Sequence, residues 1–108
     1  MASQRLRIEG DMTVYRAPEL KATLLAALGG GDACELDLSA VADIDSAGVQ
    51  LLALAQQAAK REGVALSIGA ISQPVAQALA LFDLAAHFGA ALAPAALEQV
   101  QQWQREAR

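Results

Sequence analysis

The chain has 108 residues, the size of one ordinary domain, and 55% of them are hydrophobic, which is enough for a buried core. The formal net charge is −4 and no basic stripe is present, so a nucleic-acid partner is not expected. No apolar run approaches the roughly 20 residues that a bilayer-spanning helix needs, and residues 1–10 lack the apolar stretch of a signal peptide. We therefore expect a single domain, 1–108, that is cytoplasmic and does not insert into a membrane.

The first predicted elements are two short strands, 6–9 and 12–15, in which apolar and polar residues alternate. Gly10-Asp11 lies between them and is typical of a hairpin turn, so we expect the two strands to be antiparallel. A helix is predicted over 17–28, because Pro18 suits a first helical turn and leucines recur at helical spacing. The glycines 29–31 end it.

Strands and helices alternate in the rest of the chain. Segments 33–38 and 64–68 are predicted strands, and 47–61 and 74–81 are predicted helices. This alternation indicates an α/β fold: a small mixed sheet with the N-terminal hairpin, parallel β-α-β crossovers, and helices packed on the sheet.

A last helix is predicted from Pro94 to the end of the chain. It carries one apolar stripe, formed by Leu97, Val100 and Trp103, among glutamines. Because an isolated helix of this length is marginal in water, we expect the stripe to be buried. Packing within the same domain is the simpler arrangement, and a homodimer is the alternative.

The residues offer little for catalysis, a cofactor or a metal. His87 is the single histidine and Cys34 the single cysteine, so a nucleophile–base pair, a disulfide and a cysteine-ligated metal site lack their second member. Cys34 is predicted to be a buried structural thiol. Asp43 and Asp45 lie on one short predicted loop and are better explained as solvated acids than as cation ligands.

The informative stretch runs from Asp37 through the acidic loop into the predicted helix 47–61. Ser46 is expected at the helix N-terminus, where free N–H groups and the helix dipole favour a phosphate while Asp43 and Asp45 would repel it. The alternative is that Ser46, or Asp45 before it, simply caps the helix. Gly48 is a poor residue for a first helical turn, which indicates close approach of another backbone or of a partner.

The segments Asp37-Leu38-Ser39 and Ile44-Asp45-Ser46-Ala47-Gly48 resemble the signature of STAS domains, the anti-sigma-factor antagonist family. The resemblance covers nearly the whole chain up to about Pro94, including the segments 10–20 and 71–82. It implies a non-enzymatic binding module in bacterial signal transduction, without catalytic residues or cofactors. A partner serine kinase, often an anti-sigma factor, would phosphorylate Ser46 and so release the partner.

The same resemblance implies a partner-binding face at the start of the long helix. Its candidate residues are Thr13, Asp43, Asp45, Ser46, Ala47 and Gly48. Thr13 departs from the pattern, because many antagonists have an aspartate there. Small STAS proteins with a threonine at this place accompany chemotaxis and two-component signalling genes. Another branch of the family binds the ATPase of phospholipid-transport ABC complexes, and this is the alternative function.

Overall fold

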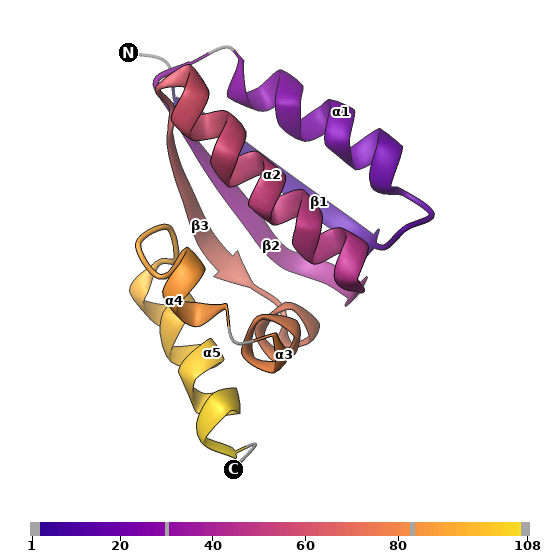
Figure 1. Cartoon of the computed structure of the whole chain (residues 1–108), viewed down its shortest axis with the longest axis vertical. Coiled ribbons are helices and arrows are strands. Elements are labelled where there is room, and N and C mark those ends of the chain that lie inside the picture. The colour runs from indigo at the N-terminus through magenta and orange to yellow at the C-terminus, as the bar shows by residue number, and fades with distance from the viewer. Residues whose placement is uncertain (1–2, 30, 83, 107–108) are drawn as a thin grey trace.

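The computed structural model describes residues 3–29, 31–82 and 84–106 (Figure 1). Three strands alternate with helices along the chain. Among the described residues, no helix is long and apolar enough to cross a bilayer. The elements in chain order are β1 (Ser3–Met12), α1 (Ala17–Leu28), β2 (Ala33–Ile44), α2 (Ser46–Glu62), β3 (Ala65–Ile71), α3 (Gln73–Leu81), α4 (Ala85–Phe88) and α5 (Pro94–Glu106). The α/β fold and the four longer helices are thus confirmed, while α4 was not predicted.

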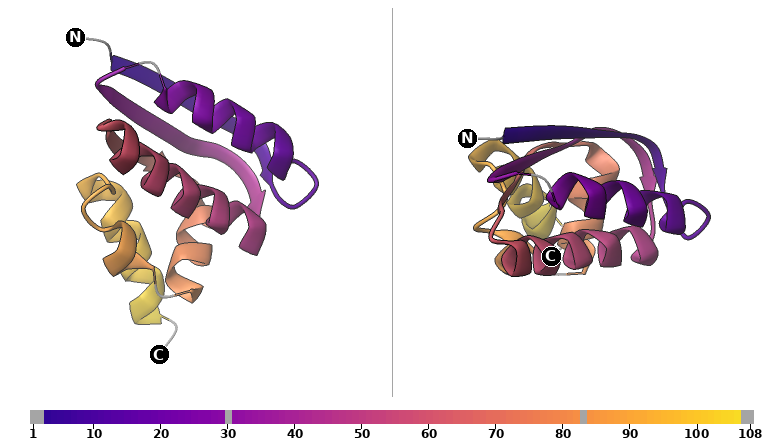
Figure 2. Two further views of the ribbon diagram at one scale, coloured as in Figure 1. Left: turned by 45° about the horizontal axis from the view of Figure 1, so that its top comes forward. Right: turned by 90° about the horizontal axis from the view of Figure 1, so that it is seen from above.

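The described strands form one sheet in the order β1-β2-β3, and both neighbouring pairs are parallel. Helices α1 and α2 lie on the same face of this sheet (Figure 2), and apolar side chains of the strands and of both helices form one buried cluster. The opposite face is polar, and ion pairs join Arg5 to Glu35 and to Asp37 across neighbouring strands. A sheet with one apolar and one charged face fixes which side the helices must cover.

The prediction of an N-terminal antiparallel hairpin is wrong. Leu6, Ile8 and Met12 all point toward the core from one continuous strand, and Met12 pairs in parallel with Ile44. Gly10 adopts a positive φ of 79°, but it does so at a shift in the register with β2 and not in a turn. The alternation with period two continues through Gly10, so burial of Met12 on the same face as Ile8 outweighs the local preference of Gly-Asp for a turn.

The strand β2 is longer than its sequence indicates, so the predicted acidic loop is also wrong. Residues 40–44 continue the pairing with β1, from Glu9 opposite Ala40 to Met12 opposite Ile44. Asp43 therefore lies in the strand, one residue before its end and opposite Asp11. The extension exists because β1, as one long strand, supplies a partner over this length.

The core lies between the sheet and the helices, and the side chains of Met12, Leu38 and Leu79 are fully buried. Cys34 is also buried, as predicted, and burial raises the pKa of its thiol. After β3, Ser72 caps α3 by accepting a hydrogen bond from the Val75 N–H at 3.4 Å.

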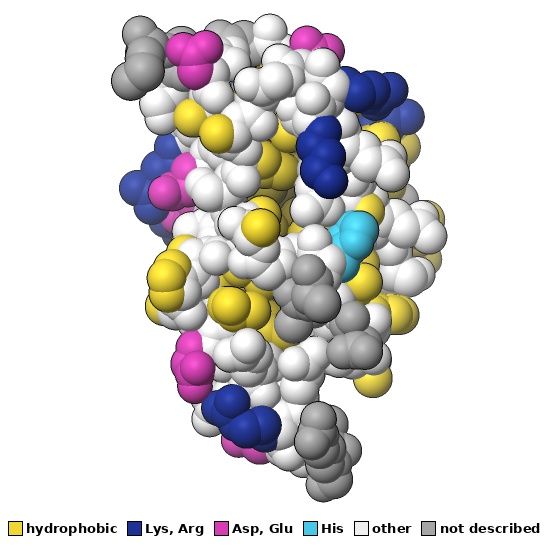
Figure 3. Space-filling view, turned by 60° about the vertical axis from the view of Figure 1, so that its left-hand side comes forward, with side chains coloured by type: hydrophobic (Ala, Val, Ile, Leu, Met, Phe, Trp, Pro, Cys, Tyr) yellow, Lys and Arg dark blue, Asp and Glu magenta, His cyan; other side chains and the backbone are white. Residues whose placement is uncertain are grey.

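Helix α5 packs against the rest of the domain, as its stripe predicts. Val100 is fully buried against the core, and Leu97 and Trp103 are half-buried beside it. The chain reaches α5 through a short bridge in which Ile68 pairs with Leu92. In the face drawn in Figure 3, hydrophobic side chains gather in the middle, and charged ones lie above and below them and along the left edge.

The packing of α5 predicts how the single tryptophan fluoresces. We expect an emission maximum of Trp103 between those of buried and fully exposed tryptophan, because its ring is half-buried within the chain. The maximum should not change on dilution. An emission that shifts to the red as the protein is diluted would show instead that a second copy covers the ring.

Candidate functional site

Asp45 organises the junction between β2 and α2. It is the N-cap of α2, and its Oδ1 accepts a hydrogen bond of 3.1 Å from the Gly48 N–H. Its Oδ2 accepts another of 3.1 Å from the Val14 N–H, which lies in the turn after β1. The Asp45 N–H donates to the Met12 carbonyl at 3.3 Å. One carboxylate thus joins the start of α2 to the end of β1.

These hydrogen bonds favour the ionised form of Asp45. The Val14 N–H lowers the pKa of the carboxyl most strongly, burial opposes this, and the N–H groups of Gly48 and Ala47 lower the pKa further. Asp45 is therefore negatively charged at neutral pH. Of the two capping residues considered from the sequence, Asp45 is the one that caps.

Ser46 is the first residue of α2, and its side chain is exposed. Because Asp45 already accepts hydrogen bonds from the start of α2, Ser46 is not needed as the cap. Its hydroxyl is accessible from outside, and the carboxylate of Asp45 precedes it. The next residue, Ala47, is half-buried.

Gly48 contacts the end of β1. A Cβ atom placed on it would lie 2.1 Å from the Met12 carbonyl oxygen and 2.7 Å from Cγ1 of Ile44. The close approach inferred from the sequence is thus made by a backbone of the same chain. Because Gly48 is buried in the fold, we expect a larger residue at this position to affect folding.

Thr13 belongs to the turn between β1 and α1, and its carbonyl accepts a hydrogen bond from the Arg16 N–H at 3.0 Å. Val14 and Tyr15, which follow it, are exposed, Tyr15 to 92%. Because the Val14 N–H is bound to Asp45, this exposed apolar turn lies beside the start of α2. Thr13 itself is half-buried.

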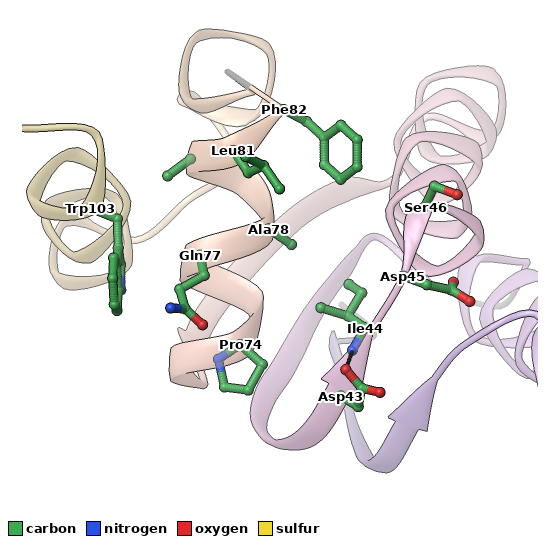
Figure 4. A pocket seen from close by; sticks show the side chains of 11 residues that line it. Asp43, Ile44, Asp45, Ser46, Pro74, Gln77, Ala78, Leu81, Phe82 and Trp103 are labelled. Carbon is green, nitrogen blue, oxygen red and sulfur yellow. Dashed lines mark hydrogen bonds between the residues drawn. The ribbon is translucent and has the colours of Figure 1, made fainter. Parts of the chain in front are cut away.

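A groove opens on the other side of the β2–α2 junction. Its volume is about 540 Å³, and it lies between the junction and α3, with Trp103 of α5 also in its wall (Figure 4). Asp43, Ile44, Asp45 and Ser46 come from the junction, and α3 with its C-cap contributes Pro74, Gln77, Ala78, Ala80, Leu81 and Phe82. Asp43 is exposed there, and its Oδ1 accepts a hydrogen bond of 2.9 Å from the Ile44 N–H.

The structure brings most of the predicted site residues together and adds an apolar component that sequence reasoning missed. The sequence predicts Leu81 only as the end of a helix followed by Phe82, yet the side chains of these two residues are exposed to 81% and 48%. Two large apolar residues side by side at a helix end cannot both face the core, and this was the available signal. Tyr15 was missed because it was placed in a strand of the hairpin.

The other candidate ligands do not gather. Among the described residues, no group of three or more His, Cys, Asp or Glu side chains has the arrangement of a metal site. His87 is exposed, and its ring makes an edge-to-face contact with the neighbouring Phe88 ring, with 4.8 Å between the two ring centroids. Asp37 is buried on the polar face of the sheet, and the Ser39 hydroxyl and N–H hold its pKa low.

Comparison with protein families supports the resemblance found in the sequence. A family described as "Mlab, STAS domain" matches residues 1–103. The chain belongs to the STAS domain family. A search of curated protein sequences returned no match.

Two solved structures resemble this STAS domain in fold. A sulfate transporter family protein from Wolinella succinogenes matches with a TM-score of 0.70 and 21% identity, covering 94% of this chain and 86% of that one. The STAS domain of a SulP transporter from Vibrio cholerae matches with a TM-score of 0.64 and 19% identity, covering 98% and 85%. At these identities the likeness establishes the STAS fold.

Proposed function

We propose that the chain is a non-catalytic, cytoplasmic protein-binding module of bacterial signal transduction, similar to anti-sigma-factor antagonists. Its partner docks on the face around the start of α2, and a partner serine kinase phosphorylates Ser46 to release it. The observation that carries this proposal is the position of Ser46, exposed between the apolar turn of Val14 and Tyr15 and the apolar groove. Contiguous exposed apolar side chains are typical of docking surfaces.

The neighbourhood of Ser46 explains how a phosphate would act. The Gly48 N–H, which a phosphate at a helix N-terminus would otherwise attract, is already bound to the Asp45 carboxylate. The charges of Asp43 and Asp45 would also repel the phosphate. A phosphate on Ser46 would therefore point outward and add about −1.5 to −2 charges to the docking face. Added charge and its desolvation cost would weaken an apolar interface.

Substitutions of Ser46 test this proposal. Once a partner has been identified by pull-down and mass spectrometry, Ser46→Asp should bind it about tenfold more weakly or worse, whereas Ser46→Ala should bind normally. Both variants should keep the stability of the parent protein, because Asp45 provides the cap. Calorimetric titration measures the affinity and urea unfolding the stability.

Ser3→Asp is the matched control, because Ser3 is exposed at the opposite end of β1 and the added charge is the same. It should bind like the parent protein. Equal affinity of Ser46→Asp and Ser46→Ala would refute the docking face. Mass spectrometry of the protein from its source cell should find phosphate on Ser46.

A second candidate is a STAS subunit that binds the ATPase of a phospholipid-transport ABC complex. The family whose model matches the chain is described as one particular type of STAS domain, Mlab, and not as an anti-sigma-factor antagonist. This function uses the same face without phosphorylation. An ATPase as the captured partner, together with unmodified Ser46, would select it; a serine kinase or a chemotaxis or two-component protein would select the first function.

A further inference from the structure

The groove beside Ser46 is apolar in its walls and acidic at one rim. Leu81, Phe82 and Trp103 provide large apolar surfaces, and Figure 4 shows α3 between Trp103 on one side and the β2–α2 junction on the other. Asp43 and Asp45 lie on the junction side. None of the described residues that line the groove is a lysine or an arginine. A ligand with apolar side chains and a positive charge would complement these walls.

The backbone of the groove restricts the form of that ligand. Most of the lining residues belong to α3 or α5, where the backbone groups of the helix interior are hydrogen-bonded within the helix. At the end of β2, the Ile44 N–H donates its hydrogen bond to the carboxylate of Asp43, so it is not available to pair with an added strand. A ligand here must satisfy its own backbone hydrogen bonds, which an α-helix does.

We propose that this groove binds an amphipathic α-helix of the partner, with aliphatic anchors against Leu81 and Phe82 and a lysine or arginine against Asp43. The inference rests on the proposed function, because it assigns the part of the partner that docks beside Ser46. Charge complementarity selects a basic helix over a second copy of this chain, whose net charge is −4.

The test uses two synthetic helical peptides without tryptophan, which share one leucine-rich face and carry either lysines or glutamates beside it. Trp103 lines the groove and is the single tryptophan, so its emission reports on occupancy. The lysine peptide should shift the emission in a saturable way. The glutamate peptide should bind at least about tenfold more weakly, which corresponds to about 1.4 kcal/mol.

Three variants locate the binding. Leu81→Ser should weaken binding of the lysine peptide about tenfold without affecting the fold, because this side chain is mostly exposed. Asp43→Asn keeps an oxygen for the Ile44 N–H but removes the charge, so it should reduce the preference for the lysine peptide. Leu25→Ser, which changes an exposed leucine on α1 outside the groove, should bind like the parent protein.

Several results would overturn the inference. They are the absence of a saturable response, equal binding of the two peptides, and unchanged affinity in Leu81→Ser or in Asp43→Asn. A dimer that Leu81→Ser converts to a monomer would assign the groove to a second copy. In all these cases the proposed function stands if Ser46→Asp still weakens binding of the captured partner and Ser46→Ala does not.

Discussion

Gly48→Ala is expected to destabilise the protein by about 3 kcal/mol, the upper part of the usual range for overpacking. The added methyl group would lie 2.1 Å from the Met12 carbonyl oxygen. This oxygen is a backbone atom that also accepts the Asp45 N–H, so β1 and α2 cannot separate without losing that hydrogen bond. In an isolated helix the same substitution would stabilise by up to about 1 kcal/mol. The sign of the effect therefore distinguishes the close contact from helix propensity.

Urea unfolding of Gly48→Ala and Gly29→Ala measures this effect. Gly29 is the matched control, because it has an ordinary helical conformation and a Cβ atom there would meet only the Leu25 carbonyl at 3.5 Å and the Ala26 carbonyl at 3.9 Å. Its replacement should change the free energy of unfolding by less than about 1 kcal/mol. A Gly48→Ala protein as stable as Gly29→Ala would show that β1 and α2 can move apart freely.

The second large effect is expected for Asp45→Ala, which removes the cap of α2 and the hydrogen bond to the turn after β1. It should destabilise the protein more than Ser72→Ala, which removes a single capping bond from α3 and for which about 1 kcal/mol is expected. Asp45→Asn should lie between these two, because an amide oxygen still caps the helix while its NH₂ group cannot accept from the Val14 N–H. Thermal unfolding of the three variants at neutral pH gives this order, and equal midpoints would contradict it.

The lowered pKa of Asp45 adds a dependence on pH. Because the folded carboxyl binds a proton less readily than the unfolded one, its stabilising effect is fully present above the ordinary value of 3.8 and is lost as the pH falls through the lower folded value. Asp37 contributes in the same direction. Stability should decline on acidification toward and below pH 3.8, and Asp45→Asn should show a smaller decline than the parent protein. An identical decline in both would assign the acid sensitivity to other groups.

Most of the fold follows from local patterns in the sequence. Helices with clear ends, such as α2 before Gly63 and α3 after Ser72, were predicted within one or two residues of their observed bounds. The error at Gly10-Asp11 arose because a turn preference acts over a few residues, whereas pairing of β1 with β2 joins residues about 30 positions apart. Long-range pairing is not visible in a single local pattern.

The candidate site, too, could be predicted only where local patterns determine the structure. The sequence placed Asp45 and Ser46 together at the start of a helix, because capping preferences are local. The groove, in contrast, combines the end of β2, α3 and α5, and its existence depends on how these elements pack. That the backbone approaching Gly48 is the one of Met12 could not be deduced for the same reason, because only the packing of α2 on the end of β1 brings these residues together.

The parallel pairing of β1 also determines when this strand can form during folding. A hairpin closes a loop of a few residues. In β1, by contrast, Ser3 pairs with Ala33 and Met12 with Ile44, so each pairing closes a loop of about 30 residues. Closing such long loops costs entropy before any contact compensates for it, so non-local pairing slows folding. During synthesis β1 remains without its strand partner until β2 has left the ribosome. The alternating apolar side chains of β1 lack this partner strand throughout that interval, so the segment can associate with other chains before it pairs with β2.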